Sequence, residues 1–263
     1  MDPSTPRTDP PPPIFTKGRI GFEVIVVLAL SLGASAVYSI VQLIDLLTRP
    51  TSLGSQTATI NQTQSARAWL DLTYQFLGIA FAIAPVLLVF HLLTLSGVNP
   101  FKRLGFDASQ PLRDLRRAGL LLAIIAIPGL AFYFVGRALG ITVNVVPAPL
   151  DPSWYTIPIL ILSALRAAIT EELIVVGYLF ERLGRLGWNT WVIIGSSALL
   201  RGSYHLYQGF GPFIGNFVMG VVFGWFYTRW GRTVPLVITH WILDIASFVG
   251  YAWAVATFPQ LFK

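Results

Sequence analysis

The chain has 263 residues, of which 54% are hydrophobic and only 11% are charged. A soluble globular domain carries about 25% charged residues, so this composition excludes that class and predicts an all-α, polytopic membrane protein. The chain has no cysteine, which excludes disulfides, thiol catalysis and cysteine-ligated metals. The net charge is +6, but the basic residues lie near helix ends and in short loops rather than on one face, so we expect no nucleic-acid partner.

The chain divides into a tail and two membrane-embedded parts. Residues 1–19 are polar and rich in proline, which predicts a disordered cytoplasmic tail. Residues 20–150 are predicted to form accessory transmembrane helices. Residues 151–263 are predicted to form the transmembrane core, because the polar residues inside apolar runs are concentrated there. A proline-rich linker, residues 142–153, separates the two parts.

Seven apolar runs predict a transmembrane bundle of about seven helices. They cover residues 20–47, 69–95, 112–139, 154–183, 188–206, 211–227 and 233–258. The fourth run would be about 45 Å long as one straight helix, against a hydrocarbon core of about 30 Å, so it must tilt, break or protrude. The sixth run carries a stripe of small residues that predicts a close helix-packing seam. The stripe consists of Gly211, Gly215, Gly220 and Gly224.

The distribution of basic residues predicts the topology. Twelve of the 18 Lys and Arg residues lie in the tail and in alternate connectors, against four on the opposite side. This asymmetry predicts a multi-pass integral membrane protein, in the plasma membrane and in contact with its lipid, with a cytoplasmic N-terminus and an external C-terminus. The two remaining residues, Arg166 and Arg201, fall inside predicted spans, where a charge without a partner is costly.

Five further ionisable side chains inside the predicted spans of the core are candidates for a functional site. They are Glu171 and Glu172 in the fourth run, His205 at the end of the fifth, and His240 and Asp244 in the seventh. His240 and Asp244 are four residues apart, as are Arg201 and His205, so each pair shares one helix face. Because each polar group in a bilayer needs polar partners, we predict that this set lines one water-accessible cavity.

This set of residues suits hydrolysis inside a membrane. A desolvated glutamate can act as a general base toward water, and histidines with a protonated or hydrogen-bonded Asp can stabilise an oxyanion. The same side chains could instead ligate a divalent metal such as zinc, and the residues alone do not choose between a metal and no cofactor. A proton- or ion-coupled transporter is an alternative from another class, because intramembrane Glu, His and Arg also mark ion pathways.

The order and spacing of these residues resemble the CPBP intramembrane proteases, which include CAAX prenyl endopeptidases and bacterial proteins of bacteriocin processing or immunity. The family pattern is Glu-Glu-x-x-x-Arg, then Phe-x-x-x-His, then His-x-x-x-Asn/Asp. Glu171 and Glu172 match the first motif, His205 matches the second, and His240 with Asp244 matches the third, within residues 154–258. The resemblance implies an endopeptidase acting on a membrane-associated peptide or protein. In it a glutamate activates water, and the His and Asp residues support the oxyanion or hold a metal.

The chain departs from the family pattern at two positions. The family arginine falls on Val176 and the family phenylalanine on Arg201. The first departure leaves open a catalytically inactive scaffold or immunity protein with the same fold. Our hypothesis is that Arg201 supplies the missing charge to the glutamates, because it shares a helix face with His205. In the alternative, Arg201 extends to the membrane interface and Arg166 pairs with the glutamates.

Overall fold

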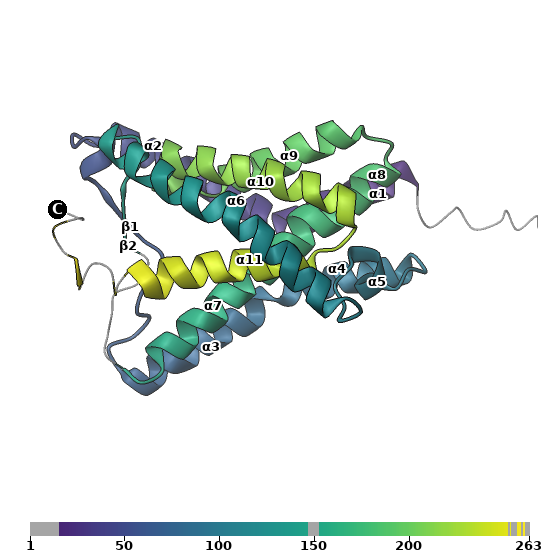
Figure 1. Ribbon diagram of the computed structural model, residues 1–263, viewed down its shortest axis with the longest axis horizontal. Helices are drawn as coiled ribbons and strands as arrows, with labels where there is room; N and C mark the ends of the chain where they lie inside the picture. The colour runs from purple at the N-terminus through teal and green to yellow at the C-terminus, as the bar shows by residue number, and fades with distance from the viewer. Residues whose placement is uncertain (1–15, 147–152, 252, 254–256, 259, 261–263) are drawn as a thin grey trace, which may run out of the picture.

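The computed structural model describes residues 16–146, 153–251, 253, 257, 258 and 260, and nearly all of its elements are helical (Figure 1). The longer helices are α1 (Lys17–Ala29), α2 (Leu32–Thr48), α3 (Ala68–Ala82), α4 (Ala84–Leu95), α6 (Pro111–Ala138), α7 (Thr156–Glu171), α9 (Thr190–Ser203), α10 (Phe210–Trp230) and α11 (Val234–Ile245). The short elements are η1 (Leu53–Ser55), β1 (Thr57–Thr59), α5 (Pro100–Leu104), β2 (Asn144–Val146), η2 (Glu172–Tyr178), α8 (Leu179–Arg185), η3 (Leu206–Gln208) and η4 (Ala246–Gly250). The predicted all-α class is confirmed.

Three predicted features fall partly outside the described residues. They are the tail, up to residue 15, the linker, at residues 147–152, and the seventh span, at residues 252 and 254–256. Helix α1 begins at Lys17, so the last three residues of the predicted tail are helical. The Thr16 side chain caps this helix by accepting a hydrogen bond from the Arg19 backbone N–H. In the linker, β2 pairs in parallel with β1, with Thr57 opposite Asn144.

Each of the seven predicted spans corresponds to a helical segment, but the segments are of two kinds. Within the described ranges, three segments are long and apolar enough to cross a membrane, or four if α1 and α2, bent by 54°, form one span. These are the first, second, third and sixth predicted spans. The other three are short or change helix type, and they carry the predicted site residues. They are α7–η2–α8, the 14-residue α9, and α11–η4.

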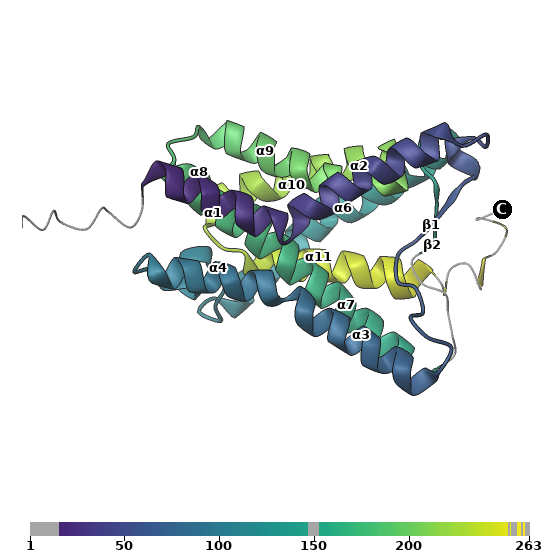
Figure 2. The same cartoon turned by 180° about the vertical axis from the view of Figure 1, so that it is seen from behind.

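The helices of residues 20–150 pack directly on those of the core. Helix α6 contacts α10 and α11, α2 contacts α9, and α3 lies along α7. Figure 2 shows α1 and α2 lying across the face that is hidden in Figure 1. Helix α11 runs toward the end of the molecule where β1 and β2 lie, and α1 begins at the opposite end. The core is therefore enclosed by accessory helices on several sides.

The fourth predicted span changes from an α-helix to a π-helix at Glu172. A π-helical turn widens the helix and leaves some backbone groups without their usual partners, and such turns are frequent at functional sites. The Ser197 hydroxyl on α9 donates a 2.7 Å hydrogen bond to the Val175 carbonyl in this segment. The segment is thus held by its neighbour, and the two glutamates lie where the helix type changes.

Two arginines counted as connector residues in the topology prediction are buried in ion pairs. Arg182 on α8 is fully buried, with Nε 2.7 Å from Glu23 Oε1 on α1. Arg232, between α10 and α11, has Nη2 2.7 Å from the buried Asp114 on α6. Buried pairs of this kind are strongly destabilising to break, because the remaining charge lacks a partner. They join α1 to α8 and α6 to the start of α11, and so fix the segments that carry the site.

Two of the four glycines in the predicted packing seam of α10 face α8 and α9, and at these two the seam is confirmed. A Cβ at Gly220 would lie 2.8 Å from the Ala198 Cα, and one at Gly224 would lie 3.0 Å from the Phe180 ring. A Cβ at Gly211 would instead meet Thr142 of the linker, and one at Gly215 would make ordinary contact with Phe132 on α6. Glycine at Gly220 therefore lets α10 approach the backbone of α9.

We expect Gly220→Ala to destabilise the protein by about 1–3 kcal/mol, because the new methyl group meets a backbone atom that moves only with α9. The same substitution at Gly78 on α3 is the matched control, since its Cβ would meet nothing within 4 Å. Thermal unfolding of the two variants in detergent measures the difference. Equal unfolding temperatures would show that the close approach does not limit packing.

Candidate active site

Three core segments supply the predicted site residues. Glu171 ends α7 and Glu172 begins η2, Arg201 is on α9 with His205 in the turn that follows it, and His240 and Asp244 are on α11. Helix α11 packs against α7, and α9 packs against η2. The polar groups of three segments therefore meet around the helix transition at Glu172.

Glu172 is the central anion of the site. Its side chain is fully buried, and its Oε1 accepts hydrogen bonds from Arg201 Nη2 at 2.5 Å and His240 Nδ1 at 2.7 Å. Its Oε2 is also buried and has no hydrogen-bond partner within the described part of the chain. One carboxylate thus joins α9 and α11 to η2 through charge-assisted hydrogen bonds.

Arg201 pairs with the glutamates, as our hypothesis proposed. It is fully buried, its Nη1 lies 3.8 Å from Glu171 Oε2, and its guanidinium lies over the Phe223 ring at 5.3 Å. The alternative placement is wrong, because Arg201 does not reach the surface and Arg166 forms no ion pair with any described residue. Val176, at the family arginine position, belongs to the same buried hydrophobic cluster as Phe223.

Glu171 is held more loosely than Glu172. Its Oε2 accepts a 2.6 Å hydrogen bond from the Tyr204 hydroxyl and lies 4.0 Å from His240 Nε2. Its side chain is 11% exposed, whereas that of Glu172 is 0% exposed. Tyr204 was not predicted from the sequence, although it follows Arg201 by three residues and so lies near the same helix face. The structure therefore adds a hydroxyl donor to the predicted set.

His240 lies between two carboxylates. Its Nδ1 contacts Glu172, and its Nε2 lies 3.5 Å from Asp244 Oδ2, one helical turn further along α11. The expected shared face of His240 and Asp244 is confirmed. The Asp244 side chain is 21% exposed, which is more than that of Glu171 or Glu172.

His205 differs from the other site residues in having no fixed partner. Both ring nitrogens are buried, and neither forms a hydrogen bond within the described ranges. Its ring packs against the Tyr204 ring with centroids 4.9 Å apart, and it lies within electrostatic range of Glu171, Arg201 and His240. The structure thus brings five predicted residues into direct contact and places the sixth beside them with unused hydrogen-bonding capacity.

These side chains do not fit a metal ion. Among the described residues, no three His, Asp or Glu side chains are arranged to hold one. The Glu172 oxygen closest to His240 is already bonded to the Arg201 guanidinium, whose positive charge would repel a cation bound there. The side chains predicted as metal ligands are thus arranged around the Arg201 guanidinium instead. They are Glu171, Glu172, His205, His240 and Asp244.

One of three comparisons with known proteins gave a match. Residues 152–246 match the family described as type II CAAX prenyl endopeptidase Rce1-like. The matched segment contains all six predicted site residues and supports the resemblance to the intramembrane proteases drawn from the motifs. Comparison with curated proteins and comparison with solved structures gave no match.

Proposed function

We propose that the chain is an intramembrane endopeptidase that hydrolyses a peptide bond of a membrane-associated peptide or protein, with Glu171 as the general base. The observation that carries the proposal is the unequal bonding of the two glutamates. Glu172 is bonded to Arg201 and His240 and is fully buried, whereas Glu171 is partly exposed and bonded to the hydroxyl of Tyr204. A base must reach both water and the substrate, and Glu171 is the better placed of the two.

In the proposed reaction, Glu171 takes a proton from water as the water oxygen bonds to the scissile carbonyl carbon. The protonated Glu171 then gives that proton to the leaving amine as the C–N bond breaks. Glu172 takes no part in the proton transfer and stays bonded to Arg201 and His240. Its role is to hold both cationic side chains beside the reacting carbonyl.

His205 is proposed to donate a hydrogen bond to the developing oxyanion. Its buried ring nitrogens have no partner in the described residues, so they are free to meet a substrate oxygen. Removing one oxyanion donor costs about 10²–10³ in rate in a well-studied hydrolase. No step of the proposed reaction uses a metal, so we expect a chelator to leave the rate unchanged.

The test is cleavage of single-span peptides by the purified protein in lipid vesicles, with products identified by mass spectrometry. We expect His205→Ala to lower the rate by about 10²–10³ with only a small fall in the unfolding temperature, because no hydrogen bond is lost and only the packing against Tyr204 is removed. The control is His91→Ala on α4, a histidine exposed on the outside of the bundle. Full activity of the His205→Ala variant would contradict its role.

The same vesicles separate the proposed function from its rivals. A wild-type protein that cleaves no peptide and carries no ion current would point to the inactive scaffold that Val176 leaves open. A current or uptake that depends on Glu171, without any cleavage, would point to the transporter. Cleavage lost in His205→Ala and retained in His91→Ala supports the peptidase.

A further inference from the structure

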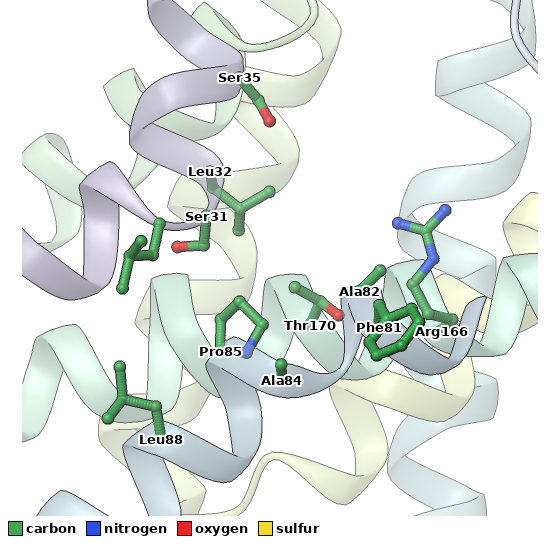
Figure 3. A pocket seen from close by; sticks show the side chains of 11 residues that line it. Ser31, Leu32, Ser35, Phe81, Ala82, Ala84, Pro85, Leu88, Arg166 and Thr170 are labelled. Atoms are coloured by element: carbon green, nitrogen blue, oxygen red, sulfur yellow. The ribbon is translucent and has the colours of Figure 1, made fainter. Parts of the chain in front are cut away.

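Two cavities of the structure differ in their distance from the candidate active site. One, of about 560 Å³, lies beside Arg166 and Thr170 of α7 (Figure 3). Thr170 immediately precedes Glu171, so this cavity belongs to the site already described. The other, of about 250 Å³, lies between the start of α9 and the last turns of α10. Most of the length of α9 separates it from Arg201, so it has no part in the proposed reaction.

The smaller cavity combines one cation with aromatic and hydroxyl side chains. It is lined by Thr190, Trp191, Ile194, Trp225, Thr228 and Arg229. The Arg229 guanidinium lies over the Trp225 ring at 5.3 Å, and it forms no hydrogen bond or ion pair with a described residue. Trp191 is 64% exposed and Trp225 is 37% exposed, so both rings border the open side of the cavity. The cavity therefore presents a fixed positive charge between two exposed aromatic rings.

A second arginine is held in the same way where α10 meets α6. The Arg117 guanidinium lies over the Trp230 ring at 4.8 Å. Its Nη1 is buried and has no hydrogen-bond partner within the described part of the chain. The neighbouring carboxylate of Asp114 is bonded to Arg232 instead. Two cations at this end of α10 are thus held on tryptophan rings, and neither is paired with a carboxylate of the described residues.

The depth of these arginines favours the phosphate of a lipid as their anion. Helix α10 is long and apolar enough to cross a membrane, so its last turn, which contains Arg229, lies near a membrane surface. Tryptophan is typical of this level, and the planar fork of arginine matches a phosphate group. A free phosphate would meet the arginines but leave the rings uncovered, whereas a phospholipid covers both.

The charge of the site selects the class of phospholipid. The connectors at this end of α10 belong to the side that is rich in Lys and Arg, which is the side predicted to face the anionic cytoplasmic leaflet. A zwitterionic headgroup brings its own cation close to the arginines, so it gains less from them than a headgroup with a net negative charge. Charge complementarity therefore favours an anionic phospholipid.

We propose that the end of α10 binds two anionic phospholipids, the phosphate of one on Arg229 in the smaller cavity and the phosphate of the other on Arg117. The Trp225 and Trp230 rings hold the two guanidinium groups in place for this contact. The first lipid joins the start of α9 to the end of α10, and so stabilises the packing of the helix that carries Arg201. This binding goes beyond the proposed function and does not depend on peptide cleavage.

The test counts the lipids retained by the purified protein in neutral detergent by native mass spectrometry. The probes are phosphatidylglycerol and phosphatidylcholine with the same acyl chains. We expect the wild-type protein to retain two molecules of phosphatidylglycerol, with an affinity about 5- to 10-fold higher than for phosphatidylcholine. Arg229→Gln and Arg117→Gln should each lose one of the two, and the double variant should lose both. Arg229→Lys should retain part of the preference, because lysine keeps the charge without the planar fork.

Arg116→Gln is the matched control, because it removes an exposed arginine next to Arg117. It should retain both lipids; an equal loss in this variant would show a diffuse effect of charge and overturn the proposal. Equal retention of phosphatidylcholine by the wild-type protein would overturn it as well. Inorganic phosphate that raises the unfolding temperature as much as phosphatidylglycerol would assign the arginines to a free anion instead.

A stability measurement separates loss of lipid from loss of fold. Without added lipid, Arg229→Gln should unfold close to the wild-type temperature, because Arg229 has no ion pair or hydrogen bond to a described residue. Phosphatidylglycerol should then raise the unfolding temperature of the wild-type protein more than that of the variant. A clear fall for Arg229→Gln before lipid is added would make Arg229 a structural residue and overturn the seat in the smaller cavity.

Discussion

Arg201→Phe is expected to destabilise the protein by about 3–5 kcal/mol and to abolish cleavage. The substitution leaves the fully buried Glu172 with only His240 as a partner, and removing one member of a buried ion pair has a cost of this size. Thermal unfolding in detergent and peptide cleavage in vesicles measure the two effects. Arg113→Phe, an exposed arginine on α6, is the control for the change of residue type.

The double variant Arg201→Phe with Val176→Arg should recover much of the lost stability. Val176 belongs to the same hydrophobic cluster as Phe223, over which the Arg201 guanidinium lies, so we expect an arginine at position 176 to start near the same ring. Val176→Arg alone should destabilise the protein, because it adds a second buried cation beside Arg201. A double variant no more stable than Arg201→Phe would show that the two positions do not exchange one charge.

Glu171→Gln is expected to lower the cleavage rate, whereas Glu172→Gln is expected to lower the stability of the protein. Glu171→Gln should lower the cleavage rate by about 10²–10⁴, the usual contribution of a general base, with little change in unfolding temperature. Glu172→Gln should lower the free energy of unfolding by about 3–5 kcal/mol, because Arg201 and His240 lose their shared anion. Rate and unfolding measured on the same preparations separate the two roles.

Asp45→Asn is the control for neutralising a carboxylate, since Asp45 is exposed and, among the described residues, forms an ion pair only with the surface residue Arg49. Asp45→Asn should change neither the cleavage rate nor the unfolding temperature, because exposed ion pairs contribute little to stability. An active Glu171→Gln protein together with a stable, inactive Glu172→Gln protein would reverse the roles assigned to the two carboxylates. That result would move the general base to the buried oxygen of Glu172 that lacks a hydrogen bond.

The sequence by itself determined the membrane class, the positions of the helical segments and most of the residues that meet in the candidate site. Apolar runs and pairs four residues apart are local features, so they can be read without knowing how the helices pack. The His240 and Asp244 pair shows this, since its geometry follows from the helix alone. The length and apolarity of a run do not show where α7 changes to the π-helix of η2. The sequence therefore does not show which of the seven runs are single long helices.

Only the tertiary structure decided which charges pair. Arg201 reaches Glu172 across 29 residues of sequence and His240 reaches it across 68, and no local spacing distinguishes these contacts from a pairing with Arg166. The same holds for Tyr204 on Glu171 and for the buried Arg182, which the sequence places in a basic connector. Each contact depends on how helices distant in the chain are placed side by side. In an apolar surrounding, that placement determines which carboxylate is paired with a cation and which stays partly exposed.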